Sequence, residues 1–308
     1  MPGAQERALR RRIRSVESTK KITRAMELIA ASRIAKAQAR ITAARPYVVE
    51  LTRALAALAR DTTQPNPMLT GTESPQRSGI VMITSDRGLA GGYSANVIKR
   101  ANQLADRLST DGVQPVRYVI GRKGMAYYRF RHIELEGTWT GFSEQPTFLA
   151  ARDATEAIVG ALQATSAGES RGKPGIDELY VVYTRFESMV TQVPTVAQVS
   201  PVRAAVEPED ESDESQALYE FEPEAEQLIE ALLPRYISAR LFAALLEAAA
   251  SESAARRRAM KSASDNADDL IRTYTRLANQ ARQAEITQEI SEIVGGADAL
   301  AAAARESE

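Results

Sequence analysis

The sequence predicts an α/β domain inserted between two long terminal helices, which pair as an antiparallel coiled coil. The first observation is a heptad pattern of apolar residues near the start of the chain, and the second is a proline-free, helix-forming segment near its end. The third is a change of period around residue 80, where short apolar runs typical of strands replace the helical spacing. The chain thus has a helical period at both ends and a strand-like period between them.

The first helix is expected from Ala8 to Arg60, so that residues 1–60 form one half of a shaft. Pro46 interrupts this segment, and we expect either one bent helix or two stacked ones. The heptad seam is apolar in its second half and polar in its middle, between Lys20 and Glu27. Its members, at alternating spacings of three and four, are Ile13, Val16, Lys20, Thr23, Glu27, Ala30, Ile34, Ala37, Ile41, Ala44, Val48, Leu51, Leu55 and Leu58.

The surface of this helix carries two further signals. A second apolar stripe of Ile22, Met26 and Ile29 lies beside the polar part of the seam and predicts contact with another partner. Residues 1–60 also hold fourteen Lys or Arg against four Asp or Glu, a net charge of +10. A nucleic-acid-binding coiled-coil protein is therefore one alternative, although few aromatic residues accompany the charges.

The middle of the chain is expected to form a Rossmann-like α/β domain over residues 78–205, after a loop over residues 61–77. Strands and helices alternate there, and the last two strands are expected to form an antiparallel hairpin. Residues 166–175, rich in glycine and charge, are expected to form a mobile surface loop. The expected strands are residues 80–84, 116–120, 178–186 and 189–201, and the expected helices are residues 93–108, 124–130 and 148–162.

The end of the chain combines an acidic segment with the second shaft helix. Residues 206–226 contain ten acidic residues, no Lys or Arg, and two prolines, which predicts extended chain. Residues 227–308 form the second helix, with an alanine-rich seam that allows the axes of two helices to approach closely. The seam residues are Tyr236, Ala239, Ala243, Leu246, Ala250, Ser253, Arg257, Met260, Ser264, Ala267, Ile271, Tyr274, Ala278 and Ala281.

The composition excludes several classes of site. With no cysteine, the chain has no disulfides or thiolate metal sites and fits a reducing compartment. No signal peptide and no run of eighteen apolar residues is evident. His132 has no ligand partner nearby in sequence. The acidic residues Asp265, Asp268 and Asp269 favour ion pairs over a metal site. We therefore expect neither a metal nor a cofactor.

The glycine-rich turn Ser85–Gly92 follows a strand and precedes a helix, the position of a phosphate cradle. It matches neither GxGxxG nor GxxxxGK[ST], so a tight structural turn is the favoured interpretation. A nucleotide-binding α/β enzyme remains an alternative that rests on this turn alone. Asp86 and Arg87, which belong to it, are candidates for contacts with other subunits.

Three separated stretches resemble the gamma subunit of the rotary F-type ATP synthase, in its bacterial form. They are Ile13–Gln38, Thr84–Gly92 (TSDRGLAGG), and the C-terminal pair Ala259–Ile271 and Ala281–Ala299. Leu218–Pro223 (LYEFEP) is similar to the family's segment that faces the membrane ring.

The resemblance implies a central rotor-stalk subunit that transmits torque and has no catalytic site of its own. Its implied partners are the alpha and beta subunits of the catalytic hexamer, the epsilon subunit and the membrane c-ring, with no nucleic acid. The implied location is peripheral, at the cytoplasmic face of the cell membrane. The residues implied to face the catalytic subunits are Met26, Arg282, Gln283 and Glu285, and those implied to meet the ring are Tyr219 and Glu222.

Overall fold

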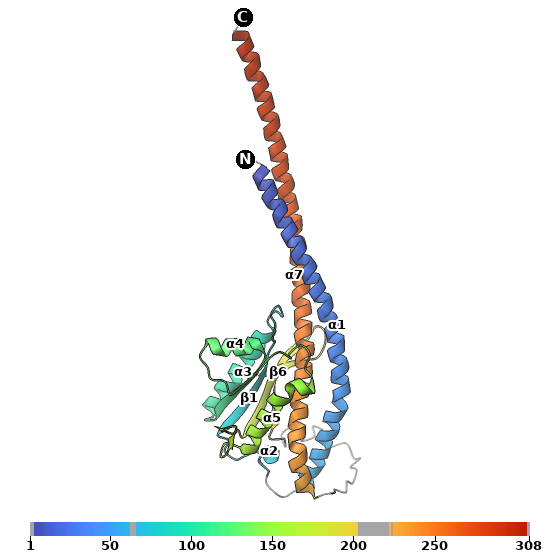
Figure 1. Cartoon of the computed structure of the whole chain (residues 1–308), viewed down its shortest axis with the longest axis vertical. Coiled ribbons are helices and arrows are strands. Elements are labelled where there is room, and N and C mark those ends of the chain that lie inside the picture. Colours follow the sequence, from blue (N-terminus) through green and yellow to red (C-terminus); the bar gives the residue numbers. More distant parts are fainter. Residues whose placement is uncertain (1–2, 62–65, 203–221, 223, 307–308) are drawn as a thin grey trace. The chain divides into compact units, whose positions relative to one another are not determined.

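This computed structural model describes residues 3–61, 66–202, 222 and 224–306 (Figure 1). Two helices, α1 (Gly3–Asp61) and α7 (Ala225–Glu306), run through both of the compact units into which the chain divides. One unit consists of Met1–Ile29 with Arg258–Glu308, and the other is Ala30–Arg257. The smaller unit is a helix pair, and the larger unit contains the α/β domain with the remaining parts of α1 and α7.

The helix pair is antiparallel, as the heptad seams predict. Thr23 faces Ser264 across it, with 2.7 Å between the two hydroxyl oxygens, and Lys20 pairs with Asp268. The numbers fall along α7 as they rise along α1, which fixes the direction of the pairing. Every predicted seam residue of both helices is buried or half-buried, the polar ones between Lys20 and Glu27 included.

The larger unit is built on a five-stranded sheet in the order β3-β2-β1-β6-β7. The strands β1, β2, β3 and β6 are parallel, and β7 runs antiparallel to β6 in the hairpin that the sequence predicts. The edge strand β3 is only three residues long, and the opposite edge strand β7 contains Pro194. The strand bounds are β1 Arg77–Ile83, β2 Gln114–Ile120, β3 Gly137–Trp139, β6 Glu178–Phe186 and β7 Gln192–Ser200.

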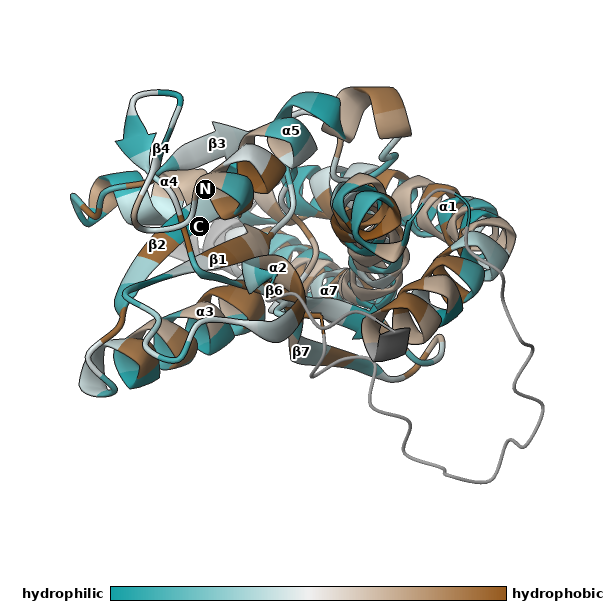
Figure 2. Ribbon diagram, turned by 90° about the horizontal axis from the view of Figure 1, so that it is seen from below, coloured by the Kyte–Doolittle hydropathy of each residue, from teal (hydrophilic) through white to brown (hydrophobic). Residues whose placement is uncertain are grey.

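Helices cover both faces of this sheet, which explains why β1 reads as a continuous apolar run. Alternate residues of β1 enter different cores: Val81 and Ile83 pack with α5 and α7, whereas Ile80 and Met82 pack with α3. Figure 2 shows α3 on one side of the strands and α5 on the other. The helix bounds are α3 Tyr93–Thr110, α4 Arg122–Phe130 and α5 Phe148–Ala164.

The structure differs from the sequence-based expectations at several short elements. Of the two alternatives at Pro46, the structure has the single helix: α1 continues through it. A short helix, α2 (Pro67–Thr70), occupies part of the expected loop because the Asn66 side chain caps it, accepting from the amide of Met68 at 3.0 Å. Strand β3 was not expected either, because three residues are too few to show a period.

The expected mobile loop at residues 166–175 instead forms a small hairpin, β4 (Glu169–Ser170) and β5 (Lys173–Pro174). Arg171 and Gly172 at its tip both have positive φ, at 53° and 74°, the combination that a tight two-residue hairpin turn requires. Its charges also find partners outside the hairpin: Arg171 pairs with Asp153 at 3.4 Å and Lys173 with Glu136 at 3.0 Å. Loop composition alone does not show these partners.

Of the described helices, none is long and apolar enough to span a membrane. Most of the acidic segment, Tyr219 included, lies outside the described residues.

Candidate functional site

The turn that follows β1 lies at the carboxyl edge of the parallel sheet, where doubly wound folds bind their ligands. Asp86 organises this edge. Its carboxylate accepts hydrogen bonds from the backbone amides of Arg122 at 3.1 Å, Gly141 at 2.7 Å and Ser143 at 3.0 Å. The amide of Asp86 in turn donates to the Ser143 hydroxyl at 2.8 Å. One side chain thus holds together the loops that follow β1, β2 and β3.

Arg256 of α7 contacts the same turn. Its guanidinium donates to the backbone carbonyl oxygens of Gly88, at 3.3 and 3.4 Å, and Arg87, at 3.4 Å. The turn therefore directs carbonyl acceptors at a cation belonging to the chain itself. An anion cradle needs amide donors at this place, so the geometry favours a structural turn over a phosphate site.

Four charged side chains gather around Arg256, and the five residues come from four segments. We name them the edge cluster: Arg33, Arg87, Glu144, Glu252 and Arg256. Arg256 lies 2.7 Å from a carboxylate oxygen of Glu252 and 3.1 Å from one of Glu144. Glu144 also pairs with Arg33 of α1 and lies 3.6 Å from the Arg87 guanidinium. The cluster joins both long helices to the loops at the carboxyl edge of the sheet.

Burial makes the charges of this cluster depend on one another. The side chain of Arg256 is 6% exposed and that of Glu252 is 1% exposed. Burial raises the pKa of Glu252, while the neighbouring Arg256 acts in the opposite direction. Burial, and next the charge of Glu252, also raises the pKa of Tyr93 well above its usual range, and the Tyr93 hydroxyl donates to the carbonyl of Ala248 at 3.2 Å. Removing one partner of a buried ion pair costs about 3–5 kcal/mol, because the other charge is left without compensation.

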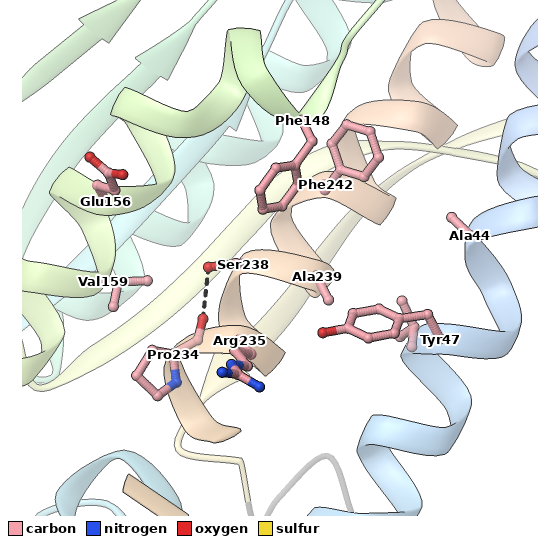
Figure 3. A pocket seen from close by; sticks show the side chains of 11 residues that line it. Ala44, Tyr47, Phe148, Glu156, Val159, Pro234, Arg235, Ser238, Ala239 and Phe242 are labelled. Atoms are coloured by element: carbon pink, nitrogen blue, oxygen red, sulfur yellow. Dashed lines mark hydrogen bonds between the residues drawn. The ribbon is translucent and has the colours of Figure 1, made fainter. Parts of the chain in front are cut away.

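The larger unit also has a pocket of about 420 Å³ between α1, α5 and α7 (Figure 3). Tyr47, Phe148 and Phe242 contribute aromatic rings to a lining that is almost wholly apolar. The Ser238 hydroxyl donates to the carbonyl of Pro234 at 2.7 Å. The charged members of the lining are Glu156 and Arg235.

In the helix pair, the residues implied to face catalytic subunits lie in two separate places. Met26 is half-buried beside the polar seam, and its stripe neighbours Ile22 and Ile29 are 61% and 53% exposed. Arg282 and Gln283 are exposed and Glu285 is half-buried. The pairing of residue 23 with 264 places Met26 close to the level of residue 261 on α7. At 1.5 Å per residue, about 30 Å of helix separates that level from Arg282.

The other candidate residues have simple surroundings. Arg87 is exposed except for its contact with Glu144, and Glu222 is exposed. His132 is exposed, in a left-handed backbone conformation with φ 55°. Asp268 pairs with Lys20, and Asp269 lies 3.9 Å from Arg272. Within the described residues, no group of three or more potential ligands could hold a metal ion.

Sequence reasoning missed most of the edge cluster, because its members are far apart along the chain. One signal was present: Glu252 and Arg256 are one helical turn apart within a stretch of alanine and serine. Charged residues at helical spacing inside such a small-residue stretch indicate a buried ion pair. Nothing in the sequence points to Glu144 or Arg33 as their partners.

Comparison with known proteins identifies the family. A family model described as "ATP synthase" matches residues 5–300. A protein of Saccharopolyspora erythraea called "ATP synthase gamma chain" is 55% identical over 309 residues, covering 98% of this chain and 100% of that protein. A protein of the same description from Acidothermus cellulolyticus is 54% identical over 304 residues, covering 99% and 100%.

Solved structures show the same fold at low sequence identity. A chain of the Euglena gracilis mitochondrial ATP synthase rotor, in rotational state 1, has a TM-score of 0.61 at 17% identity and covers 92% of this chain and 99% of its own length. A chain from the OSCP/F1/c-ring structure of the same enzyme, in rotational state 3, has a TM-score of 0.66 at 16% identity, with coverages of 97% and 95%. With its family model matched almost from end to end and relatives more than half identical, the chain belongs to the family of ATP synthase gamma chains.

Proposed function

We propose that this chain is the central stalk of a proton-driven ATP synthase and transmits torque between a membrane ring and a catalytic head. The observation that carries the proposal is the antiparallel helix pair, whose continuous seam joins the two ends of the chain in one body. A shaft needs this construction, because a single helix bends easily whereas two packed helices resist bending and twisting together. The family membership supplies the assembly in which such a shaft works.

The helix pair has exposed apolar residues that a partner would cover. Beside Ile22 and Ile29 on α1, the residues Ile286, Ile290 and Ile293 on α7 are between 44% and 71% exposed. Exposed apolar residues on neighbouring turns are typical of interaction surfaces. We assign both places, the first with Met26 and the second with Arg282, Gln283 and Glu285, to contact with the alpha and beta subunits of the catalytic hexamer.

The α/β domain and the acidic segment are assigned to the membrane side. Tyr219, outside the described residues, and the exposed Glu222 are proposed to meet the c-ring, and the epsilon subunit is proposed to bind the same part of the rotor. Arg87 remains a candidate for subunit contact because its side chain is 71% exposed. The carboxylate of Asp86 is engaged with three backbone amides, so we assign Asp86 to holding the turn.

The chain is proposed to lack catalysis of its own and to lie at the cytoplasmic face of the cell membrane through its partners.

The test deletes the gene for this chain in its host and then supplies the chain again. We expect membranes without the chain to lose ATP-driven proton pumping, and the untagged chain to restore pumping and to co-purify with the alpha, beta and epsilon subunits and the ring. Two results would contradict the proposal: ATP hydrolysis by the purified chain alone, or restored proton pumping with no subunit that co-purifies with the chain.

A further inference from the structure

We propose that the edge cluster is a torsional clamp. It fixes α1 and α7 to the α/β domain at the last point where the domain holds them, and so sets the stiffness of the path along which torque passes. The proposal rests on the rotor function proposed above and assigns Arg256 and Glu144 as its positioning residues.

The position of the cluster along the helices is the first argument. The larger compact unit begins at Ala30 and ends at Arg257. Arg33 lies within one turn of the first limit, and Arg256 is adjacent to the second. The apolar core that α7 shares with the sheet and α5 has its last α7 member at Ala248, two turns earlier. Near these limits, α7 meets the loops of the domain through the ion pairs and hydrogen bonds of Arg256, and α1 meets them through the ion pair of Arg33.

The kind of contact is the second argument. Apolar packing against small side chains is not directional, so it resists sliding and twisting less than hydrogen bonds of defined angle do. The planar guanidinium of Arg256 reaches two carboxylates and two backbone carbonyl oxygens together. Glu144, in the loop after β3, reaches Arg33 on α1 and Arg256 on α7. One loop residue thus holds both helices. A twist of α7 against the domain must distort the hydrogen bonds from Arg256 to the carbonyls of Arg87 and Gly88, and a twist of α1 must distort the hydrogen bond from Arg33 to Glu144.

Stability alone does not explain such a cluster. Buried ion pairs often contribute no more to folding than well-packed apolar residues of similar volume, because the charges lose their hydration. What the cluster adds over apolar packing is a defined geometry between the helices and the domain. Lysine would keep one charge without the planar fork, so it cannot reproduce this geometry.

The experiment uses the assembled complex, with the catalytic head immobilised and a bead attached to the membrane ring. The angular variance of the bead while rotation is stalled measures the torsional stiffness of the rotor. We compare the parent chain with Arg256→Met, Glu144→Gln and Arg256→Lys. The control is Arg152→Met, which breaks an exposed ion pair with Glu156 on α5 of the same domain.

The clamp predicts a larger angular variance for Arg256→Met and Glu144→Gln than for the parent, and an intermediate variance for Arg256→Lys. In all variants the ATP hydrolysis rate per assembled complex should stay at the parent value. The angular variance of the control Arg152→Met should also stay at the parent value. Parent variance in an assembled Arg256→Met or Glu144→Gln complex would overturn the clamp. So would failure of both variants to assemble, because the cluster would then serve folding. If the parent chain itself fails to support ATP-driven proton pumping, the rotor function fails instead, which separates the two proposals.

Discussion

A disulfide between positions 23 and 264 tests the antiparallel pairing of α1 and α7 directly. Thr23 and Ser264 are both buried, and 2.7 Å separates their hydroxyl oxygens, so cysteines at these positions place two sulfur atoms at bonding reach. Because the chain has no cysteine, the double variant Thr23→Cys/Ser264→Cys contains only the two thiols of interest. We expect mild oxidation to close the bond nearly completely in the isolated chain.

The magnitude follows from the length of the loop that the bond closes. The two positions are 241 residues apart in sequence. Restricting an unfolded loop of that length stabilises the folded chain by about 5 kcal/mol in the chain-entropy model, an upper figure because engineered bonds often add strain. The oxidised double variant should therefore melt at a higher temperature than its reduced form.

The assay is gel mobility without reductant, followed by thermal melting with and without reductant. The matched control is Ala25→Cys/Ser264→Cys, because Ala25 is exposed and lies two residues, or about 200°, around the α1 axis from Thr23. Equal cross-linking of both pairs, or none in the first, would refute the pairing. In the assembled complex the bond lies inside one rotating body, so ATP hydrolysis should survive oxidation.

Three further predictions concern separate parts of the chain. Asp177→Ala should destabilise the α/β domain by about 3 kcal/mol, because the 4% exposed carboxylate accepts from three backbone amides. Burial raises the pKa of Asp177, but these hydrogen bonds lower it by more, so its pKa lies below the ordinary carboxyl value. The ionised Asp177 therefore stabilises the folded state above about pH 4, and this stabilisation is lost as the pH falls below that value. Thermal melting between pH 3 and pH 7 should show this loss in the parent and a smaller one in Asp177→Asn; equal profiles would count against it. Met26→Lys should leave assembly intact but lower the protons pumped per ATP, because the surrounding subunits must accommodate a new charge at a cost of about 1–3 kcal/mol. Met26→Leu is the control. If the lysine variant pumps as many protons per ATP as the parent, Met26 does not lie in the contact with the catalytic subunits. Deleting residues 166–175 should cost about 2–4 kcal/mol, since it removes two ion pairs and also two hydrogen bonds: the Ser166 amide donates to Asp177 at 2.9 Å, and Arg77 donates to the Gly175 carbonyl at 3.0 Å. If the hairpin hinders ATP hydrolysis more than synthesis, the deletion should raise the ratio of the hydrolysis rate to the synthesis rate in membrane vesicles. An unchanged ratio would show that the hairpin has no such role.

The predictable part of the fold is the part that repetition encodes. The seam of α1, including its polar members Lys20 and Thr23, could be read from spacing alone, and each predicted seam residue is at least half-buried. The apolar runs within β1 and β6 were likewise visible, because strands covered on both faces are mostly apolar in sequence.

The parts that were missed depend on single contacts between distant residues. The hairpin at residues 166–175 looks like a mobile loop until Asp153 and Glu136 are placed beside it. The same holds for Glu144, a loop residue with no local pattern that becomes the centre of an ion cluster only when α1 and α7 are present. Asp86, a candidate for subunit contact because of its motif, also has an internal role that the sequence does not show, since its carboxylate accepts from three backbone amides.

The two edge strands have a consequence for a body that turns inside a crowded assembly. An open strand edge presents unpaired backbone groups on which any passing extended segment can add a strand. Here β3 offers only three residues, and Pro194 removes one backbone donor from β7. Both edges are poor templates for strand addition, so neighbouring chains find little to adhere to. A rotor domain passes fixed neighbours repeatedly, so sheet edges that rarely pair with other chains reduce the contacts that would slow its rotation.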